Sequence, residues 1–238
     1  MSPTPITTDL LVLHQGINID IESIAPLQHY GPDAYDVANM TITATVQSPV
    51  DQEYRLVLAA DVEAGTSAFV RVVSASKAHF KDVRNFKRIV KKDVGILQPV
   101  LAKAGIALET GDQQKQLEAQ ASNYKIADIR IPAGQHVLRI HASQQLKPVD
   151  GDPRRYRFTM YAPQLSLAPA GNVRLGATVI FPLDFTATVD TPLVEPMPGQ
   201  PAVSLVGGGD TPVQVGLQRA YGWAFQADPK ITMSYRYA

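Results

Sequence analysis

The chain has 238 residues, of which 45% are hydrophobic and 18% charged, and it contains no cysteine. The absence of cysteine excludes disulfides, thiolate catalysis and cysteine-ligated zinc or iron–sulfur sites. The length allows one large all-β domain or two smaller ones. The charged fraction is below the usual level of about 25%, and a lightly charged surface favours a protein that lives in an assembly.

Charge is separated along the sequence although the whole chain is neutral. The first 54 residues carry seven acidic side chains and no lysine or arginine, whereas residues 77–92 carry seven positive charges and one negative charge, Asp82. Patches of opposite sign steer partners together during association. The separation therefore predicts contact with a partner.

The N-terminus shows neither a basic segment nor an apolar segment of the kind found in signal peptides. No apolar run reaches the roughly 18 residues that a membrane-spanning helix requires. We therefore expect no membrane span, and a chain that stays in the cytoplasm or in a particle or virion assembled there.

Alternation of apolar and polar residues with a period of two dominates the chain. Ile17, Ile19 and Ile21 alternate with polar side chains, and residues 40–46 alternate in the same way with threonines on the wet face. Further strands are expected at 54–60, 68–74, 125–131, 137–142, 155–161, 173–181, 185–189, 213–217, 221–225 and 231–237. Many short strands separated by Pro, Gly and Asp turns are typical of a β-sandwich or barrel.

Residues 77–122 depart from this alternation. From Phe80 to Leu101 the apolar residues recur at helical spacing, and the positive charges fall on an adjoining stripe. This pattern predicts an amphipathic basic helix, with a second, polar helix at 112–122. We therefore expect a helical insertion at 77–122 between two β-rich halves.

Several shorter segments follow the insertion. Asp150-Gly151-Asp152 is expected to form a hairpin turn, and the arginines just after it to form a small basic patch. Residues 191–201, which include four prolines, predict an extended arm or loop. Gly207-Gly208-Gly209 predicts a flexible turn, and the apolar strand at 231–237 would offer free backbone groups to another chain if it lay at a sheet edge.

The basic segment admits several interpretations. It could contact the acidic N-terminal segment of another subunit, a nucleic acid, or an anionic lipid, or it could be a solvated helix face that covers the sheet. Nucleic acid is the less favoured partner because such binders are usually basic overall and interleave exposed aromatics. The candidate partner-binding residues are Lys77, Lys81, Arg84, Lys87, Arg88, Lys91 and Lys92 on the basic side, and Asp20, Glu22, Asp33 and Asp36 on the acidic side.

Other chemistry is weaker in the sequence. Asp20 and Glu22 share a strand face, but a solvent-facing acidic pair is the simpler interpretation than a glycosidase or calcium site. Trp223 and Tyr221 could stack a sugar or fill the core. The five histidines do not form a ligand set. We assign no catalytic residue, no metal ligand and no cofactor.

Together these observations predict an all-β fold. We expect a jelly-roll-like β-sandwich, 1–238, as a single domain with the helical insertion. The leading function is that of a structural, self-assembling protein, such as a coat or capsid subunit, and not an enzyme. The alternatives are a β-sandwich module that binds carbohydrate or another small ligand, and a metal-dependent cupin-like enzyme.

Overall fold

The computed structural model describes residues 10–59, 67–79, 81–82, 124–161, 174–182, 185–196, 205–216, 218–225 and 229–238. This part of the chain is all-β: apart from one short 3₁₀ helix, η1 (Ala25–Gln28), every regular element in it is a strand. The expectation of an all-β protein is therefore confirmed.

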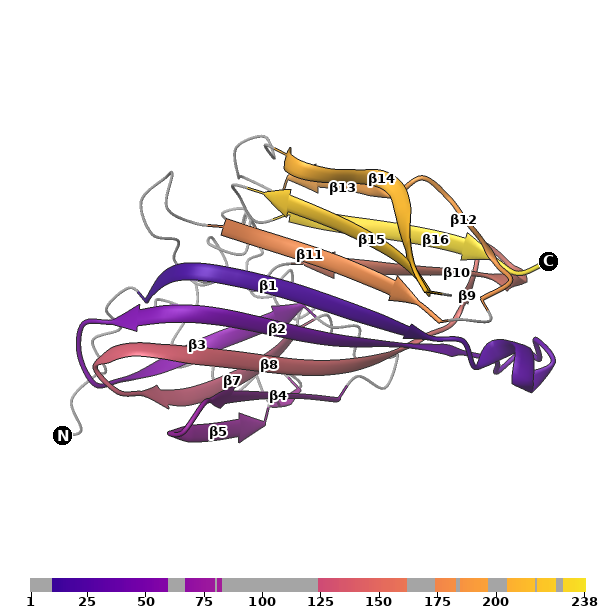
Figure 1. Ribbon diagram of the computed structural model, residues 1–238. Coiled ribbons are helices and arrows are strands. Elements are labelled where there is room, and N and C mark those ends of the chain that lie inside the picture. The colour runs from indigo at the N-terminus through magenta and orange to yellow at the C-terminus, as the bar shows by residue number, and fades with distance from the viewer. Residues whose placement is uncertain are drawn as a thin grey trace, which may run out of the picture.

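The largest sheet has eight strands, which Figure 1 shows from β14 at the top to β5 at the bottom. Its order is β14 (Leu205–Val215), β15 (Gln218–Phe225), β11 (Arg174–Phe181), β1 (Leu11–Glu22), β2 (Asp36–Ser48), β8 (Gly134–Leu146), β4 (Ser67–Val72) and β5 (Ser76–His79). Neighbours are antiparallel except β1 and β11, which pair in parallel.

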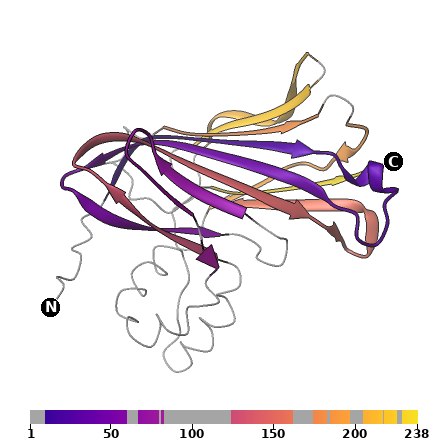
Figure 2. The same cartoon turned by 90° about the horizontal axis from the view of Figure 1, so that it is seen from below.

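Two smaller sheets complete the described fold. One contains β12 (Thr188–Val189), β16 (Pro229–Arg236), β10 (Asp152–Tyr161) and β9 (Pro148–Val149), and β13 (Leu193–Pro196) also pairs with β16. The other contains β3 (Gln52–Ala59), β7 (Tyr124–Ile131) and β6 (Lys81–Asp82). Figures 1 and 2 show most of the long strands running in similar directions along the length of the molecule.

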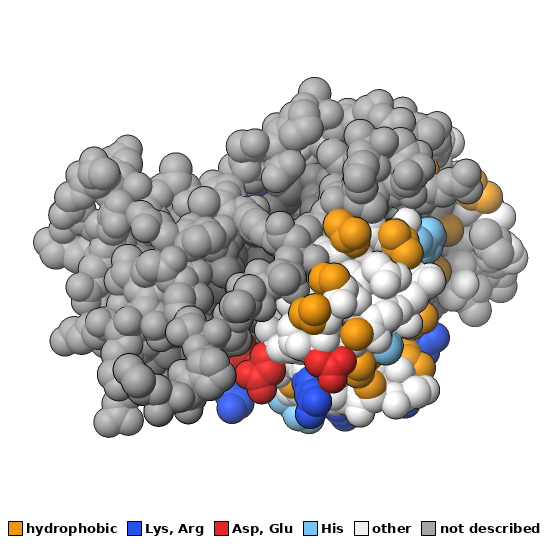
Figure 3. Space-filling view, turned by 90° about the vertical axis from the view of Figure 1, so that its left-hand side faces the viewer, with side chains coloured by type: hydrophobic (Ala, Val, Ile, Leu, Met, Phe, Trp, Pro, Cys, Tyr) orange, Lys and Arg blue, Asp and Glu red, His pale blue; other side chains and the backbone are white. Residues whose placement is uncertain are grey.

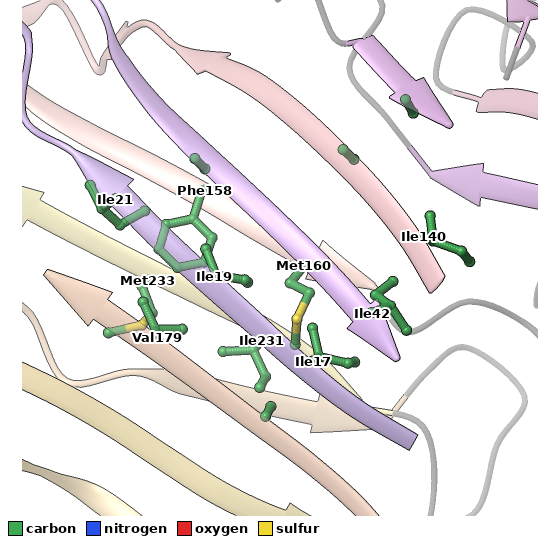
Figure 4. Close-up of a cluster of buried hydrophobic side chains, with 14 of the residues drawn as sticks. Ile17, Ile19, Ile21, Ile42, Ile140, Phe158, Met160, Val179, Ile231 and Met233 are labelled. Carbon is green, nitrogen blue, oxygen red and sulfur yellow. The ribbon is translucent and has the colours of Figure 1, made fainter. Parts of the chain in front are cut away.

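The period-2 pattern explains the core. Residues that face one another across the large sheet form a buried row over six strands: Trp223, Ala177, Ile17, Ile42, Ile140 and Val70. Figure 4 shows Ile17, Ile19, Ile21 and Val179 gathered with Phe158, Met160, Ile231 and Met233 of β10 and β16. Burying this apolar surface is the main favourable contribution to folding, at about 25 cal/mol per Å².

We call the face that carries this row the inner face of the large sheet and the opposite face the outer face. The outer face bears the alternate residues, most of which are half-buried or exposed. Because successive side chains of a strand point to opposite sides, every polar residue between two core residues is assigned to the outer face by parity alone.

The turn between β9 and β10 has the form that the sequence predicted. Val149 pairs with Asp152, so that Asp150 and Gly151 are the two loop residues. Both have positive φ, 59° and 71°. This is the backbone of a tight type I′ hairpin, for which Asp-Gly is a preferred dipeptide.

Three expectations about local structure need correction. Ser76–His79 and Lys81–Asp82 are strands, so a helical insertion does not begin at residue 77. Residues 83–122 lie outside the described part of the chain. The three glycines at 207–209 belong to strand β14 instead of a turn, and Leu193–Pro196 of the proline-rich segment pairs with β16 as a strand.

The position of β16 also differs from the edge strand considered above. It lies between β10 on one side and β12 and β13 on the other. Its backbone groups are therefore engaged within the same molecule, because neighbours on both sides pair with it. The alternation of Ile231, Met233, Tyr235 and Tyr237 is confirmed, since all four are buried.

Candidate interaction surface

The predicted acidic residues occupy two different environments. Asp20 and Glu22 are exposed on the outer face of β1, and Glu22 Oε1 accepts a hydrogen bond of 2.6 Å from Asn39 Nδ2. Asp33 is exposed in the segment that precedes β2. We call Asp20 and Glu22 the acidic pair.

Asp36 must be removed from the set of partner-binding residues because it is fully buried. Its Oδ1 accepts hydrogen bonds of 2.8 Å from the backbone N–H groups of Ile24 and Ala25, at the start of η1. Its Oδ2 accepts hydrogen bonds of 2.7 Å from the hydroxyls of Tyr235 and Tyr237. A buried carboxylate with four donors is a structural group, which ties β16 to η1 and β2.

The tyrosines around Asp36 are held in their neutral form. Burial, followed by the nearby Asp36 charge, raises the pKa of Tyr156 to about 12. Burial is also the largest cause that raises the pKa of Tyr235 and of Tyr237 above the usual range. Because the Tyr237 hydroxyl donates to Asp36, the Ser23 hydroxyl, 2.6 Å away, donates to the Tyr237 oxygen.

Of the predicted basic residues, two lie in the described part of the chain. Lys77 is exposed on β5, with its Nζ 4.5 Å from the centroid of the Phe69 ring, and Lys81 is exposed on β6. The remaining five, Arg84, Lys87, Arg88, Lys91 and Lys92, fall outside the described residues.

Sequence reasoning missed two cations that the strand register places beside Lys77. Arg139 of β8 pairs with Arg71 of β4, and Arg71 pairs with Lys77 of β5. We call these three exposed residues the basic row. Within the described residues none of them has an ion pair. Like charges directly opposite one another are unfavourable. Contact with an anionic group would therefore lower the electrostatic free energy of the basic row.

A ring cluster adjoins the basic row on the outer face. His141 stacks on Phe69 with ring centroids 4.8 Å apart, and His79 lies 6.1 Å from Phe69. His141 Nδ1 is 3.2 Å from Thr41 Oγ1. Burial, together with the positive charges of Arg139 and Lys77, lowers the pKa of His141 below its ordinary value.

The two cross-strand rows that contain the basic row and the ring cluster continue over β2, β1, β11 and β15 with small side chains on the outer face. These rows contain Gly16, Gly176 and Gly222 beside Asn18, Thr41, Thr43 and Thr178. A Cβ at any of these three glycines would meet no atom closer than 3.9 Å, and none of the three has positive φ. Neither crowding nor backbone conformation within the subunit requires glycine here.

Two of the three arginines after the Asp150-Gly151 turn, Arg155 and Arg157, are neutralised inside the molecule, whereas Arg154 lies over the Tyr30 ring, 5.1 Å from its centroid. Asp150 forms ion pairs with Arg155 at 3.7 Å and with Arg157 at 3.0 Å, and Arg155 also reaches Asp190 at 3.2 Å. Asp152 binds Arg236 at 2.6 Å, and this hydrogen bond is the largest cause that lowers the pKa of Asp152. At the end of the molecule shown in Figure 3, acidic and basic side chains also lie close together.

Trp223 and Tyr221, the candidate sugar-stacking residues, point into the core. They are 4% and 5% exposed, and their rings stack on one another with centroids 6.2 Å apart. The core-filling interpretation therefore holds for both. In the described part of the chain, the Trp223 indole N–H and both amide atoms of the buried Gln15 lack a hydrogen-bond partner.

Neither family models nor curated proteins match this sequence. Among solved structures, the chain is similar to an M1 zinc metallopeptidase from Deinococcus radiodurans, with 9% identity over 98% of this chain and 44% of that one, and a TM-score of 0.37. It is also similar to a putative nutrient binding protein from Legionella pneumophila, with 11% identity over 96% and 68% of the two chains and a TM-score of 0.42. The chain thus spans less than half of the metallopeptidase, and at these TM-scores neither likeness carries an argument. Among the described residues there is no helix long and apolar enough to cross a membrane.

Proposed function

We propose that this chain is a structural, self-assembling protein, such as a coat or capsid subunit of a virion or a similar particle component, that assembles in the cytoplasm. One observation carries the proposal. The acidic pair and the basic row are both exposed, and within the described residues no ion pair joins either of them to a charge of opposite sign. Arg155 and Arg157 of β10, in contrast, form ion pairs with carboxylates of their own molecule.

The distance between the two groups supports this interpretation. Asp20 lies two strands and four residues away from Arg139 in the register of β1, β2 and β8. Strand spacing and rise put the two backbone positions about 16 Å apart. This is about twice the Debye length of 8 Å at physiological ionic strength, so the charges do not neutralise one another across one subunit.

In this proposal the charges direct the encounter and set its orientation. Exposed ion pairs contribute only about 0.2–1 kcal/mol each, so apolar and backbone contacts must supply most of the affinity. In this proposal the all-β fold serves as a jelly-roll-like shell domain, a fold class that includes viral capsid domains. The sugar-binding alternative has no support from Trp223 and Tyr221, because both are buried.

Light scattering across a series of protein and salt concentrations tests this function. We expect particles larger than a monomer at low ionic strength, and a shift toward smaller species as salt screens the exposed charges. Electron micrographs of the same samples show whether the assemblies have a regular form. A monomer under every condition would rule the proposal out.

A further inference from the structure

The outer face of the large sheet carries both kinds of unpaired charge at separate places. The acidic pair lies on β1, toward the end of the strand that leads to η1. The basic row crosses β8, β4 and β5. In the strand register it lies four residues along the strand direction from Asp20, the nearer residue of the acidic pair. Thr41 on β2 lies midway between Asp20 and Arg139, because it is one strand and two residues from each.

This arrangement is self-complementary. A two-fold axis that lies in the plane of the face and passes near Thr41 carries Asp20 of one copy over Arg139 of the other. By strand spacing and rise, the same rotation carries Glu22 over the part of the row formed by Arg71 and Lys77. Each contact occurs twice, as an isologous interface between identical surfaces requires.

The centre of the face favours close approach. Gly16, Gly176 and Gly222 lie on β1, β11 and β15, which are one, two and three strands from Thr41 on the same side, and nothing within the subunit requires glycine at these positions. Glycine inside a strand weakens that strand, and it often marks a place where another backbone comes near. Small side chains on this part of the face allow two sheets to stack, because packed sheets lie about 10 Å apart.

The available area is also sufficient. The five strands β11, β1, β2, β8 and β4 have 8, 12, 13, 13 and 6 residues. At an average of about ten residues they cover roughly 24 by 33 Å, or about 800 Å². A stable interface of standard size buries about 800 Å² on each partner.

From these observations we infer that the outer face of the eight-stranded sheet binds the same face of a second copy, through a two-fold axis near Thr41. The inference rests on the proposed function, because it names the partner and the surface that self-assembly uses. The acidic pair of each copy contacts the basic row of the other, and the glycine-containing centre lets the two sheets approach.

Two charge-reversal variants of the full chain test the pairing. The first is Asp20→Lys with Glu22→Lys, and the second is Arg71→Glu with Lys77→Glu and Arg139→Glu. We expect each variant alone to dimerise at least tenfold more weakly than the wild type in sedimentation at low salt, since like charges then face each other. An equal mixture of the two variants is expected to form heterodimers, because every facing pair is again opposite in sign.

A steric variant tests the centre of the face independently of charge. Gly16→Val adds a side chain where the nearest atom of the same subunit, His14 Cε1, is 3.9 Å from the new Cβ. We expect the melting temperature at a dilution where the wild type is monomeric to be unchanged or raised, since valine favours strands. Dimerisation is expected to fall at least tenfold.

Controls separate this inference from the proposed function. Asp33→Lys and Lys81→Glu reverse exposed charges that the pairing does not use. If both reversal variants assemble as strongly as the wild type while these control variants do not, the inference is overturned and the proposed function stands. A wild type that never associates would overturn both, as would a monomer that saturably binds an oligothymidylate without self-association, which would identify nucleic acid as the occupant. If circular dichroism shows that a reversal variant does not fold, the neutral pair Asp20→Asn with Glu22→Gln replaces it, and undiminished dimerisation then contradicts the inference.

Discussion

At the scale of single residues, Asp36 shows how a charge that the sequence groups with an acidic patch can belong to the core. The sequence contains it in a polar segment between two strands, but its carboxylate accepts four hydrogen bonds and has no exposure to solvent. Two of its four partners, Tyr235 and Tyr237, are 199 and 201 residues away in the sequence. No local pattern identifies such a contact.

Replacement of Asp36 is therefore expected to be costly. Asp36→Ala leaves two backbone N–H groups and two tyrosine hydroxyls without their acceptor, and buried unsatisfied donors are expensive. We expect the free energy of unfolding to fall by about 3 kcal/mol or more in urea denaturation. The matched control Asp20→Ala, at an exposed site, should change it by no more than about 0.5 kcal/mol. Equal effects of the two substitutions would contradict the structural role of Asp36.

The titration of His141 reports on the basic row. Its pKa is lowered mainly by burial, and then by Arg139 and Lys77, with His79 and Arg71 as the other titratable or charged groups on the neighbouring strands. We expect a midpoint below the ordinary 6.5 in an NMR titration. Lys77→Gln should raise that midpoint part of the way toward 6.5, because burial and Arg139 remain.

The lowered pKa of His141 also makes the stability of the fold depend on pH. The folded state binds the proton of His141 less readily than the unfolded state does. The contribution of His141 to stability is therefore fully present above pH 6.5, and it decreases as the pH falls from there through the folded-state pKa. Lys147→Gln, which removes an exposed charge just after β8, is the control and should leave the titration of His141 unmoved. A midpoint at 6.5 or above would contradict the environment described here.

At the scale of elements, the β9–β10 hairpin is the part of the fold that its own residues specify most directly. Asp150 and Gly151 adopt the positive φ values that a type I′ turn requires. The turn also presents the Asp150 carboxylate to Arg155 and Arg157 of the following strand. Backbone conformation and charge thus favour the same register.

Gly151→Ala tests the turn. An alanine at φ of 71° is strained, so we expect the free energy of unfolding to fall by about 1–2 kcal/mol. Gly209→Ala is a matched control, since Gly209 lies in β14 at ordinary φ with nothing within 4 Å of an added Cβ. Chemical denaturation of both variants measures the difference, and a loss at Gly209 as large as that at Gly151 would show that the turn is not the cause.

The strands were predictable because each of them carries its own alternation of apolar and polar residues. The expected strands overlap observed ones, and some, such as 40–46 in β2 and 221–225 in β15, lie wholly inside them. Register was not predictable, since it depends on which strand lies beside which. Arg71 and Arg139 could each be assigned to a polar strand face from the sequence, but only the pairing of β4 with β8 brings them together.

The misassigned segments have physical reasons as well. Ser76–His79 is too short for its alternation to be distinguished from the start of the basic helical pattern, and pairing with β4 makes it a strand. Gly207-Gly208-Gly209 has the composition of a turn, yet β15 pairs with all three residues. In both cases hydrogen bonds to a distant strand outweigh a local preference.

At the scale of the whole molecule, charge is distributed in two ways. On β10 and its neighbours, acids and bases meet inside the subunit, and on the outer face of the large sheet they stay apart. The predicted separation of charge along the sequence therefore becomes a separation across one surface, carried in the described residues by Asp20, Glu22 and three cations of which the sequence analysis named only Lys77. The salt series and the reversal variants described above test whether this separation of charge directs assembly.

The parallel pairing of β1 with β11 has a consequence for how the protein is made. His14 pairs with Arg174, so that one side of β1 has no neighbour until the ribosome has added a further 160 residues or so to it. Contacts between such distant positions are slow to form, and a strand with an open edge is vulnerable to mispairing while it waits. Nascent chains of this protein should consequently depend on chaperones, or on slow translation, more than chains of similar length with local topology.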